Sequence, residues 1–185
     1  MSFKILEHKT WAITITEEEM EIQYHRLSLD EIDKASEQIT ISYTSAYKGL
    51  MDDSYLASLS KHHWSPILQN SIHNGDICMA ATCNNTMIGS TVFSIINAEK
   101  EKYAEWHAFY LLPQYIGHGI GHSFYQIIEK EMLDQGCLQC ILEVLSSNER
   151  AVQFYLSHGF SKTETFVVEE YGMTLSCDKM VKKFR

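Results

Sequence analysis

A proline followed by three alternating glycines marks the segment best suited to bind an anion. Pro113 ends an apolar, strand-like run, and Gly117, Gly119 and Gly121 precede a stretch with helical spacing. A glycine-rich turn at a helix start leaves several backbone N–H groups without partners, and the helix dipole adds positive potential at that end. The segment therefore predicts a phosphate-binding turn.

The glycine spacing separates three kinds of phosphate site. A dinucleotide fingerprint needs G-x-G-x-x-G, but position 122 is His122, and the Gly-Lys-Ser/Thr of a P-loop is absent. The remaining pattern, Q/R-x-x-G-x-G/A, is met by Gln114, Gly117 and Gly119. This pattern resembles the coenzyme A pyrophosphate loop of the GCN5-related N-acetyltransferases (GNAT). A glycine turn without a ligand is the plain alternative.

A second segment resembles the late signature of the same family. It contains Asn148, Ala151, Phe154-Tyr155 and Gly159-Phe160, directly after a strand-like run. Ser147 or Asn148 can cap a helix start, and Gly159 can end the helix in a left-handed conformation. An ordinary amphipathic helix would also fit. Two matches in the family's order identify the chain, by resemblance, as a member of this family.

The resemblance implies an α/β (α+β) fold of the GNAT acyl-CoA N-acyltransferase type, with a mixed, mostly antiparallel sheet and helices on both faces. We expect residues 1–20 to form an N-terminal extension, in which an extra strand or two could form, and residues 21–185 to form the N-acetyltransferase domain. Apolar periodicity predicts strands over 22–26, 76–83, 87–97, 103–112, 140–144, 161–168 and 173–181. It predicts helices over 29–46, 53–60, 66–73 and 119–135.

The same resemblance implies transfer of an acetyl group from acetyl-CoA to a primary amine, by direct attack in a ternary complex. Family members often carry Arg or Lys where this chain has His118. Phosphate binding is therefore expected to depend more on backbone dipoles. The residues expected to contact the coenzyme are Phe109, Tyr110, Leu111, Gln114, Gly117, His118, Gly119, Ile120, Gly121, Asn148 and Tyr155.

The transfer needs a base for the amine and an acid for the departing thiolate. Many family members carry a glutamate at the position of Glu105, which makes it the expected base, with His107 in reserve. Tyr155 occupies the family's tyrosine position and is the expected acid. The alternatives without a catalytic role are that Glu105 is a surface residue of the strand and that Tyr155 is a buried aromatic ring.

The residues do not identify the amine that accepts the acetyl group. The family's first-helix region lines the acceptor site, so Tyr43, Tyr47 and Tyr55 are candidates for a substrate wall, although packing in the core explains them equally well. The stretch around Tyr47 weakly resembles small-amine and polyamine acetyltransferases. A small-molecule amine and a protein amine both stay open.

Composition narrows the function classes. The 185 residues, 45% of them hydrophobic, suffice for one well-buried core. A net charge of −9 argues against nucleic acid as a partner and fits a cationic substrate. No apolar run approaches the ~20 residues that cross a bilayer, and the charged N-terminus is unlike a secretory signal. A cytoplasmic location without membrane binding is the expectation.

The cysteine and histidine patterns predict no metal site and no disulfide framework. Five cysteines, an odd number, fit a reducing compartment, and Cys137-x-x-Cys140 has no second ligand pair. His118 and His122 have a metal-like spacing but lack an acidic partner motif.

Two rival functions remain at this point. One is a non-catalytic acyl-CoA sensor, and the other is a Rossmann-type oxidoreductase, which the glycine spacing disfavours. The oligomeric state is also open at this point; a homodimer is one candidate, because dimers are common in the family.

Overall fold

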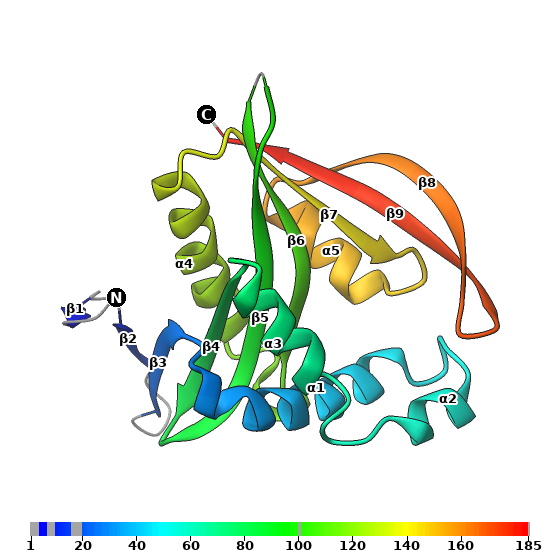
Figure 1. The fold of residues 1–185 in the computed structure, drawn as a ribbon, viewed down its shortest axis with the longest axis horizontal. Coiled ribbons are helices and arrows are strands. Elements are labelled where there is room, and N and C mark those ends of the chain that lie inside the picture. Colours follow the sequence, from blue (N-terminus) through cyan, green and yellow to red (C-terminus); the bar gives the residue numbers. More distant parts are fainter. Residues whose placement is uncertain (1–3, 7–9, 16–19, 100, 185) are drawn as a thin grey trace. The chain divides into compact units, whose positions relative to one another are not determined.

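The computed structural model describes residues 4–6, 10–15, 20–99 and 101–184, and Figure 1 shows the order of their elements. The strands are β1 (Lys4–Leu6), β2 (Thr10–Ile15), β3 (Met20–Arg26), β4 (Ile77–Cys83), β5 (Thr86–Asn97), β6 (Lys102–Leu111), β7 (Gln139–Leu145), β8 (Ser161–Glu170) and β9 (Met173–Lys183). The α-helices are α1 (Ile32–Tyr47), α2 (Asp53–Ser58), α3 (Ser65–His73), α4 (Ile120–Asp134) and α5 (Glu149–Ser157). Short 3-10 turns occur at η1 (Leu29–Glu31) and η2 (Pro113–Tyr115).

The predicted fold class is confirmed, and every strand and helix predicted from residue 22 onward is present with small shifts at its ends. The N-terminal extension contributes β1 and β2, while its residues 1–3, 7–9 and 16–19 lie outside the described residues. Where the extension gives way to the main domain stays a prediction. None of the helices in the described ranges combines the length and apolar character needed to cross a bilayer.

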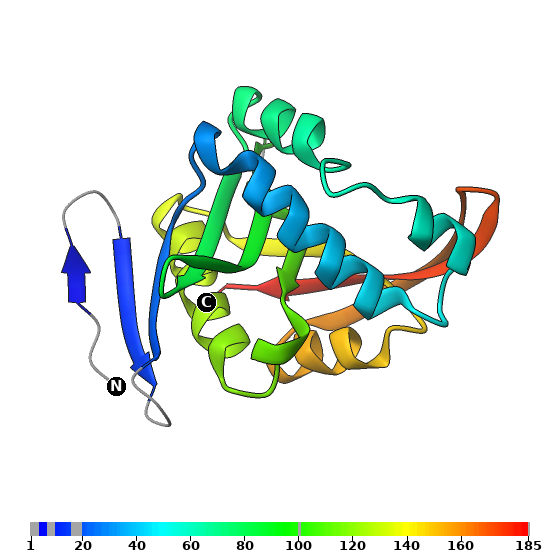
Figure 2. The same ribbon diagram turned by 90° about the horizontal axis from the view of Figure 1, so that it is seen from below.

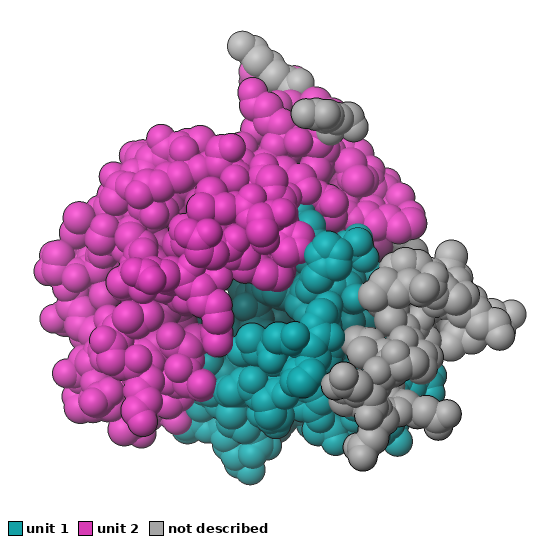
Figure 3. Space-filling view, turned by 180° about the vertical axis from the view of Figure 1, so that it is seen from behind, with its two compact units in different colours: residues 1–43, 60–92, 108–128 teal, residues 44–59, 93–107, 129–185 magenta. Residues whose placement is uncertain are grey.

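The chain divides into two compact units, coloured separately in Figure 3. Unit 1 comprises residues 1–43, 60–92 and 108–128, and unit 2 comprises residues 44–59, 93–107 and 129–185. Strands β5 and β6 each begin in one unit and end in the other.

Unit 1 holds the strands in the order β1-β2-β3-β4-β5-β6, and the first three neighbouring pairs are antiparallel. A two-residue turn joins β4 to β5. Its residues, Asn84 and Asn85, have φ angles of 47° and 62°, as a hairpin turn of the mirror-image type requires. In this unit α1 and α3 cover one face of the strands and α4 covers the other (Figure 2).

Different contacts hold the helices on the two faces of unit 1. On the α4 side, the buried ring of Tyr24 lies 5.0 Å from that of Phe124, and its hydroxyl donates to the Ile120 carbonyl at 3.4 Å. On the α1 side, the Ser90 hydroxyl donates to Gln38 Oε1 at 2.7 Å. Both partners of that bond are buried, so it ties α1 to β5 without leaving a polar atom unsatisfied.

Unit 2 holds the strands in the order β5-β6-β7-β9-β8. β6 and β7 are parallel, whereas β7–β9 and β9–β8 are antiparallel. α5 packs on this sheet through an aromatic group in which the rings of Trp106 and Tyr155 lie 5.5 Å apart and those of Tyr155 and Phe160 lie 5.6 Å apart. Asn148 begins α5 as predicted, because its side chain accepts the Ala151 N–H at 3.3 Å.

The five cysteines are all unpaired, and four of them are buried. Burial raises the pKa of the Cys78 thiol to about 11 and also raises the pKa values of Cys137 and Cys140. Thiols kept protonated in this way are poor nucleophiles and poor metal ligands. The Cys137-x-x-Cys140 pair is therefore part of the core of unit 2 and is not poised for redox chemistry.

A buried carboxylate joins two strands and a loop in unit 2. Asp178 on β9 accepts from Lys162 Nζ at 2.8 Å, Ser146 Oγ at 2.8 Å and Thr165 Oγ1 at 2.9 Å. The hydrogen bond from Lys162 is the largest of the effects that lower the pKa of Asp178 below its usual value. The ionised carboxylate is thus the form that this site stabilises.

We expect Asp178→Asn to lower the melting temperature at neutral pH by roughly 3–6 °C, because charged hydrogen bonds are lost. A depressed folded-state pKa gives stability that is complete above the unfolded pKa, near ~3.9, and is lost as the pH falls through the folded value. The wild type should therefore lose more stability than the variant on acidification. Melting curves from pH 7 to pH 3 test this. Asp134→Asn, which breaks an exposed pair with Lys130, is the control and should shift the curves little.

Candidate active site

The predicted anion-binding turn has the geometry that its glycines require. Gly117 and Gly119 have φ angles of 90° and 77°, values that side-chain-bearing residues rarely adopt. The backbone N–H groups of Gly117 through Gly121 make no backbone hydrogen bond within the described residues. Five consecutive donors are therefore open at the start of α4, where the helix dipole also favours an anion.

Packing in unit 1 fixes the position of this turn. Ile120 is fully buried, so only its backbone N–H is open to a ligand, while the side chain anchors the helix. The ring of Phe124, one turn later, contacts Tyr24 and Phe109 at centroid distances of 5.0 and 5.6 Å. Phe109 lies on β6, so the strand and the helix start are held together by one aromatic contact set.

The last residues of β6 approach β5 unusually closely. A Cβ atom on Gly89 would lie 2.9 Å from Leu111 Cδ1 and 3.0 Å from the Tyr110 carbonyl oxygen. Leu112 N–H donates to the Ile88 carbonyl at 2.8 Å, so the far end of the strand is also fixed. Gly89 is thus required for the position of Tyr110 and Leu111, two of the residues expected to contact the coenzyme.

The parallel pairing of β6 with β7 covers only part of either strand. Its register runs from Tyr103 opposite Gln139 to Trp106 opposite Leu142, although β7 continues to Leu145. Within the described part of unit 2, His107 and Glu143 do not extend the ladder. An interrupted ladder leaves strand donors and acceptors that an extended ligand can pair with.

The two candidate bases occupy the same strand in different surroundings. Glu105 is half-buried, and its carboxylate makes no hydrogen bond or ion pair with any residue in the described ranges. His107 is exposed, and its Nε2 lies 2.7 Å from Ser94 Oγ, a contact that sequence reasoning did not find. Glu105 is therefore available to accept a proton, whereas one ring nitrogen of His107 is already engaged.

Tyr155 projects from α5 and is held by its ring and not by its hydroxyl. The ring lies edge-on to Trp106, at 74°. Its hydroxyl makes no hydrogen bond within the described residues. Burial, with a smaller electrostatic contribution from Tyr47, raises the pKa of the Tyr155 phenol. The phenol stays protonated at neutral pH and can act as a donor.

Glu105 and Tyr155 belong to opposite faces of β6. Successive strand residues point to opposite faces, and Tyr155 packs on Trp106, the neighbour of Glu105. A base and an acid placed in this way can serve opposite sides of a group bound at the strand edge. They cannot form a directly bonded dyad.

The three tyrosines expected to line an acceptor site are distributed between the units. Tyr43 lies in unit 1 and contacts Trp64 and Tyr110 at 5.1 and 6.0 Å between ring centroids. Tyr55 lies in unit 2 and stacks on Tyr171 at 4.2 Å. Sequence reasoning missed Trp64, since nothing in its local sequence signals a contact with Tyr43.

No group of three or more metal-ligating side chains occurs among the described residues. His118 is exposed in the glycine turn. The Gln126 amide donates to His122 Nε2 at 3.0 Å, so this nitrogen is engaged within α4.

Comparison with known proteins points to one family. A family model described as the acetyltransferase (GNAT) family matches residues 42–160. A spermidine N(1)-acetyltransferase from Thermoplasma acidophilum is 27% identical over 161 residues, which cover 82% of this chain and 98% of the relative.

Solved structures agree with this match. The PaiA N-acetyltransferase of Thermoplasma acidophilum, crystallised with coenzyme A, superposes with a TM-score of 0.71 and 28% identity, covering 88% of this chain and 99% of that one. The ribosomal-protein-S18-alanine N-acetyltransferase of Escherichia coli gives a TM-score of 0.69 at 15% identity, covering 88% and 93%. The latter likeness concerns the fold alone.

Gly89→Ala should weaken coenzyme A binding by roughly 10-fold, because a methyl group at this position displaces Tyr110 and Leu111. Isothermal titration with coenzyme A measures the effect. Gly75→Ala is the control, since Gly75 also tolerates substitution poorly (φ of 86°) but has open space around it. It should lower stability without changing the affinity, and equal losses in both variants would show that strain alone is responsible.

Proposed function

Because the chain belongs to the GNAT acetyltransferase family and is an acetyl-CoA-dependent acyltransferase, we propose that it acetylates a primary amine of a small, polyamine-like molecule. The observation that carries the proposal is the row of five open N–H donors beside the end of β6 in unit 1. A protein amine is the second acceptor class.

The coenzyme is held mainly by backbone groups. The diphosphate accepts from the N–H groups of Gly117 through Gly121, while Gln114 and His118 line the same turn. The pantetheine arm extends along Phe109, Tyr110 and Leu111, so that the Leu111 N–H polarises the thioester carbonyl. Asn148 and Tyr155 complete the contacts from α5.

Glu105 prepares the nucleophile. An alkylamine has a pKa near ~10 and is mostly protonated at neutral pH. The unengaged carboxylate of Glu105 accepts one of these protons, directly or through a water molecule. The neutral nitrogen then attacks the thioester carbon and forms a tetrahedral intermediate with a positively charged nitrogen, which loses its second proton to solvent before the intermediate collapses.

Tyr155 completes the transfer. Collapse of the intermediate breaks the carbon–sulfur bond, and the sulfur leaves as a thiolate. The Tyr155 hydroxyl donates a hydrogen bond or its proton to this sulfur, and solvent returns the proton to the phenol. The raised pKa of Tyr155 keeps the phenol protonated, so that it is available as a hydrogen-bond donor to the thiolate.

The charge of the chain and one of its relatives both support a polyamine as the acceptor of the acetyl group. The net charge of −9 attracts cationic amines, and the 27% identical relative is a spermidine N(1)-acetyltransferase. Release of the coenzyme thiol with a panel of polyamines, aminoglycosides, amino acids and peptide N-termini tests the proposal. Turnover with polyamines is the expected result. Coenzyme binding without turnover on any amine would instead identify an acyl-CoA sensor.

The biological setting is also part of the proposal. We expect a cytoplasmic enzyme that needs no metal, binds neither nucleic acid nor membrane, and forms a homodimer. Sedimentation of the purified protein checks the homodimer, and activity after treatment with a chelator checks the metal.

Tyr155→Phe should lower turnover by ~10-fold or more and leave acetyl-CoA binding nearly intact, because only the donor to the leaving sulfur is removed. Steady-state rates and coenzyme titration measure the two effects. Phe154→Leu, which alters the adjacent ring on α5 without removing a hydroxyl, is a control for packing. An unchanged turnover in Tyr155→Phe would remove this residue from the mechanism.

Glu105→Gln should lower turnover at neutral pH by ~100-fold, the lower end of the range for a general base. The deficit should shrink as the pH approaches ~10, because the amine then loses its proton without help. Rates from pH 7 to pH 10 provide the measurement. His107→Gln is the matched variant on the same strand. If its loss exceeds that of Glu105→Gln, the base is His107.

A further inference from the structure

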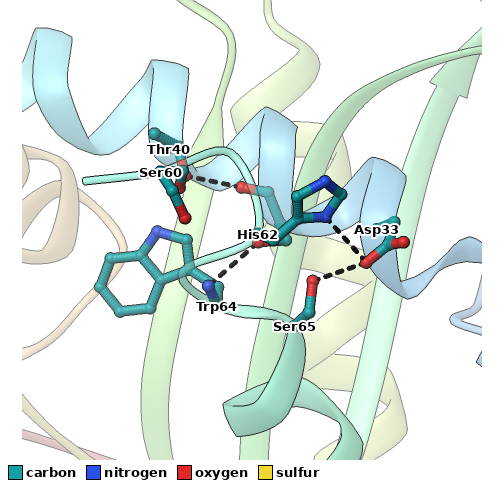
Figure 4. A network of polar contacts seen from close by, with 7 residues as sticks. Asp33, Thr40, Ser60, His62, Trp64 and Ser65 are labelled. Carbon is teal, nitrogen blue, oxygen red and sulfur yellow. Dashed lines mark hydrogen bonds and ion pairs between the residues drawn. The ribbon is translucent and has the colours of Figure 1, made fainter.

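Residues 60–65, which include Trp64, are hydrogen-bonded to α1 at several points (Figure 4). Three residues of α1, spaced three and four apart, take part: Asp33, Ser36 and Thr40. Asp33 Oδ1 accepts from Ser65 Oγ at 2.7 Å and from His62 Nδ1 at 3.1 Å. Ser36 Oγ accepts the Trp64 backbone N–H at 3.0 Å, and Thr40 Oγ1 donates to the Ser60 carbonyl at 3.1 Å.

These hydrogen bonds hold the Trp64 indole next to a group of aromatic rings in unit 1. Tyr43, the next residue on the same helix face, lies 5.1 Å from Trp64, and Tyr110 lies 6.0 Å from Tyr43. The His63 ring meets Trp64 edge-on at 4.8 Å. We name Tyr43, Trp64 and Tyr110 the aromatic cluster. Tyr43 is buried, but Trp64 and Tyr110 are only half-buried, so part of the cluster remains accessible.

The cluster also contains an unused donor. Trp64 Nε1 is buried and has no hydrogen-bond partner in the part of the chain that the structure describes. Buried donors in native proteins are almost always satisfied by protein, water or ligand. A water molecule is therefore expected beside this ring edge; a cationic amine, which has no lone pair to offer, would contact the face of the ring instead.

The position of the cluster links it to the reaction. Tyr110 is part of the β6 segment on which the thioester is expected to lie, and it follows Phe109, which contacts α4. A substrate amine must reach the same segment. The rest of the substrate then extends over adjacent residues of unit 1, and the aromatic cluster is among them.

We propose that the aromatic cluster binds the second, non-reacting ammonium group of a diamine or polyamine, with Trp64 as the residue that decides specificity. This inference rests on the proposed function. An ammonium over an aromatic face is attracted by the ring quadrupole, and tryptophan provides the strongest such face. The alkyl chain between the two nitrogens packs on the same rings. A monoamine fills only part of this subsite.

Two substrates of matched length test the proposal. 1,4-Diaminobutane and pentylamine differ in one end group, an ammonium in the first and a methyl in the second. We expect Trp64→Leu to lower the ratio of their kcat/KM values, diamine over monoamine, by ~10-fold, within the range measured for cation–π contacts. Trp64→Phe, which keeps a weaker aromatic face, should lower the ratio less. Ile67→Ala, at an exposed position on α3, is the control and should leave the ratio unchanged.

The outcomes separate this inference from the proposed function. An unchanged ratio of kcat/KM values in a folded Trp64→Leu variant overturns the subsite. If both kcat/KM values fall equally, the ratio is also unchanged, and the loss indicates packing alone. If Trp64→Leu does not fold, Trp64→Phe decides by the same ratio.

Thermal stabilisation by 1,4-diaminobutane in the presence of coenzyme A gives a readout that needs no turnover. If the wild type acetylates no amine but this stabilisation depends on Trp64, the function fails and the subsite holds. If the stabilisation is the same in the variants, the subsite fails as well.

Discussion

Backbone donors without internal partners are the constraint on which this structure depends. The N–H groups from Gly117 to Gly121 point out of the start of α4 with no backbone acceptor in the described chain. Leaving such groups unpaired costs free energy unless water or an anion meets them. The molecule holds them in place with two fully buried aromatic residues, Tyr24 and Phe124, and with a hydrogen bond to the Ile120 carbonyl. The rigidity of unit 1 is therefore concentrated where a charged ligand would be received.

The short ladder between β6 and β7 likewise leaves backbone donors and acceptors without a partner in that ladder, in this case on a strand. Pairing stops at Trp106 and Leu142 within unit 2, and Glu105 and Tyr155 lie on opposite faces next to this point. The two groups with proton-transfer roles in our proposal are thus kept apart by the strand itself.

Features with a local steric cause could be predicted from the sequence. The positive φ angles of Gly117, Gly119, Asn84 and Asn85, and the cap at Asn148, all follow from residue type and near neighbours. Apolar periodicity predicted the order of strands and helices, and the resemblance to the family predicted the fold. Contacts between distant segments could not be predicted. The contacts of Tyr43 with Trp64 and Tyr110, and that of Ser94 with His107, depend on helix placement and strand register, which no short motif records. The roles assigned to individual site residues stay predictions.

The buried cysteines have a practical consequence for enzymology. Burial raises the thiol pKa of Cys78, Cys137 and Cys140, and the half-exposed Cys177 is shifted in the same direction. Only a very small thiolate fraction is then present near neutrality, and thiolate is the species that reacts with disulfide dyes and alkylating reagents. A colorimetric reagent for free sulfhydryl groups should consequently register the coenzyme product against a low background from the protein itself. Turnover of this chain can therefore be followed continuously by an inexpensive optical method.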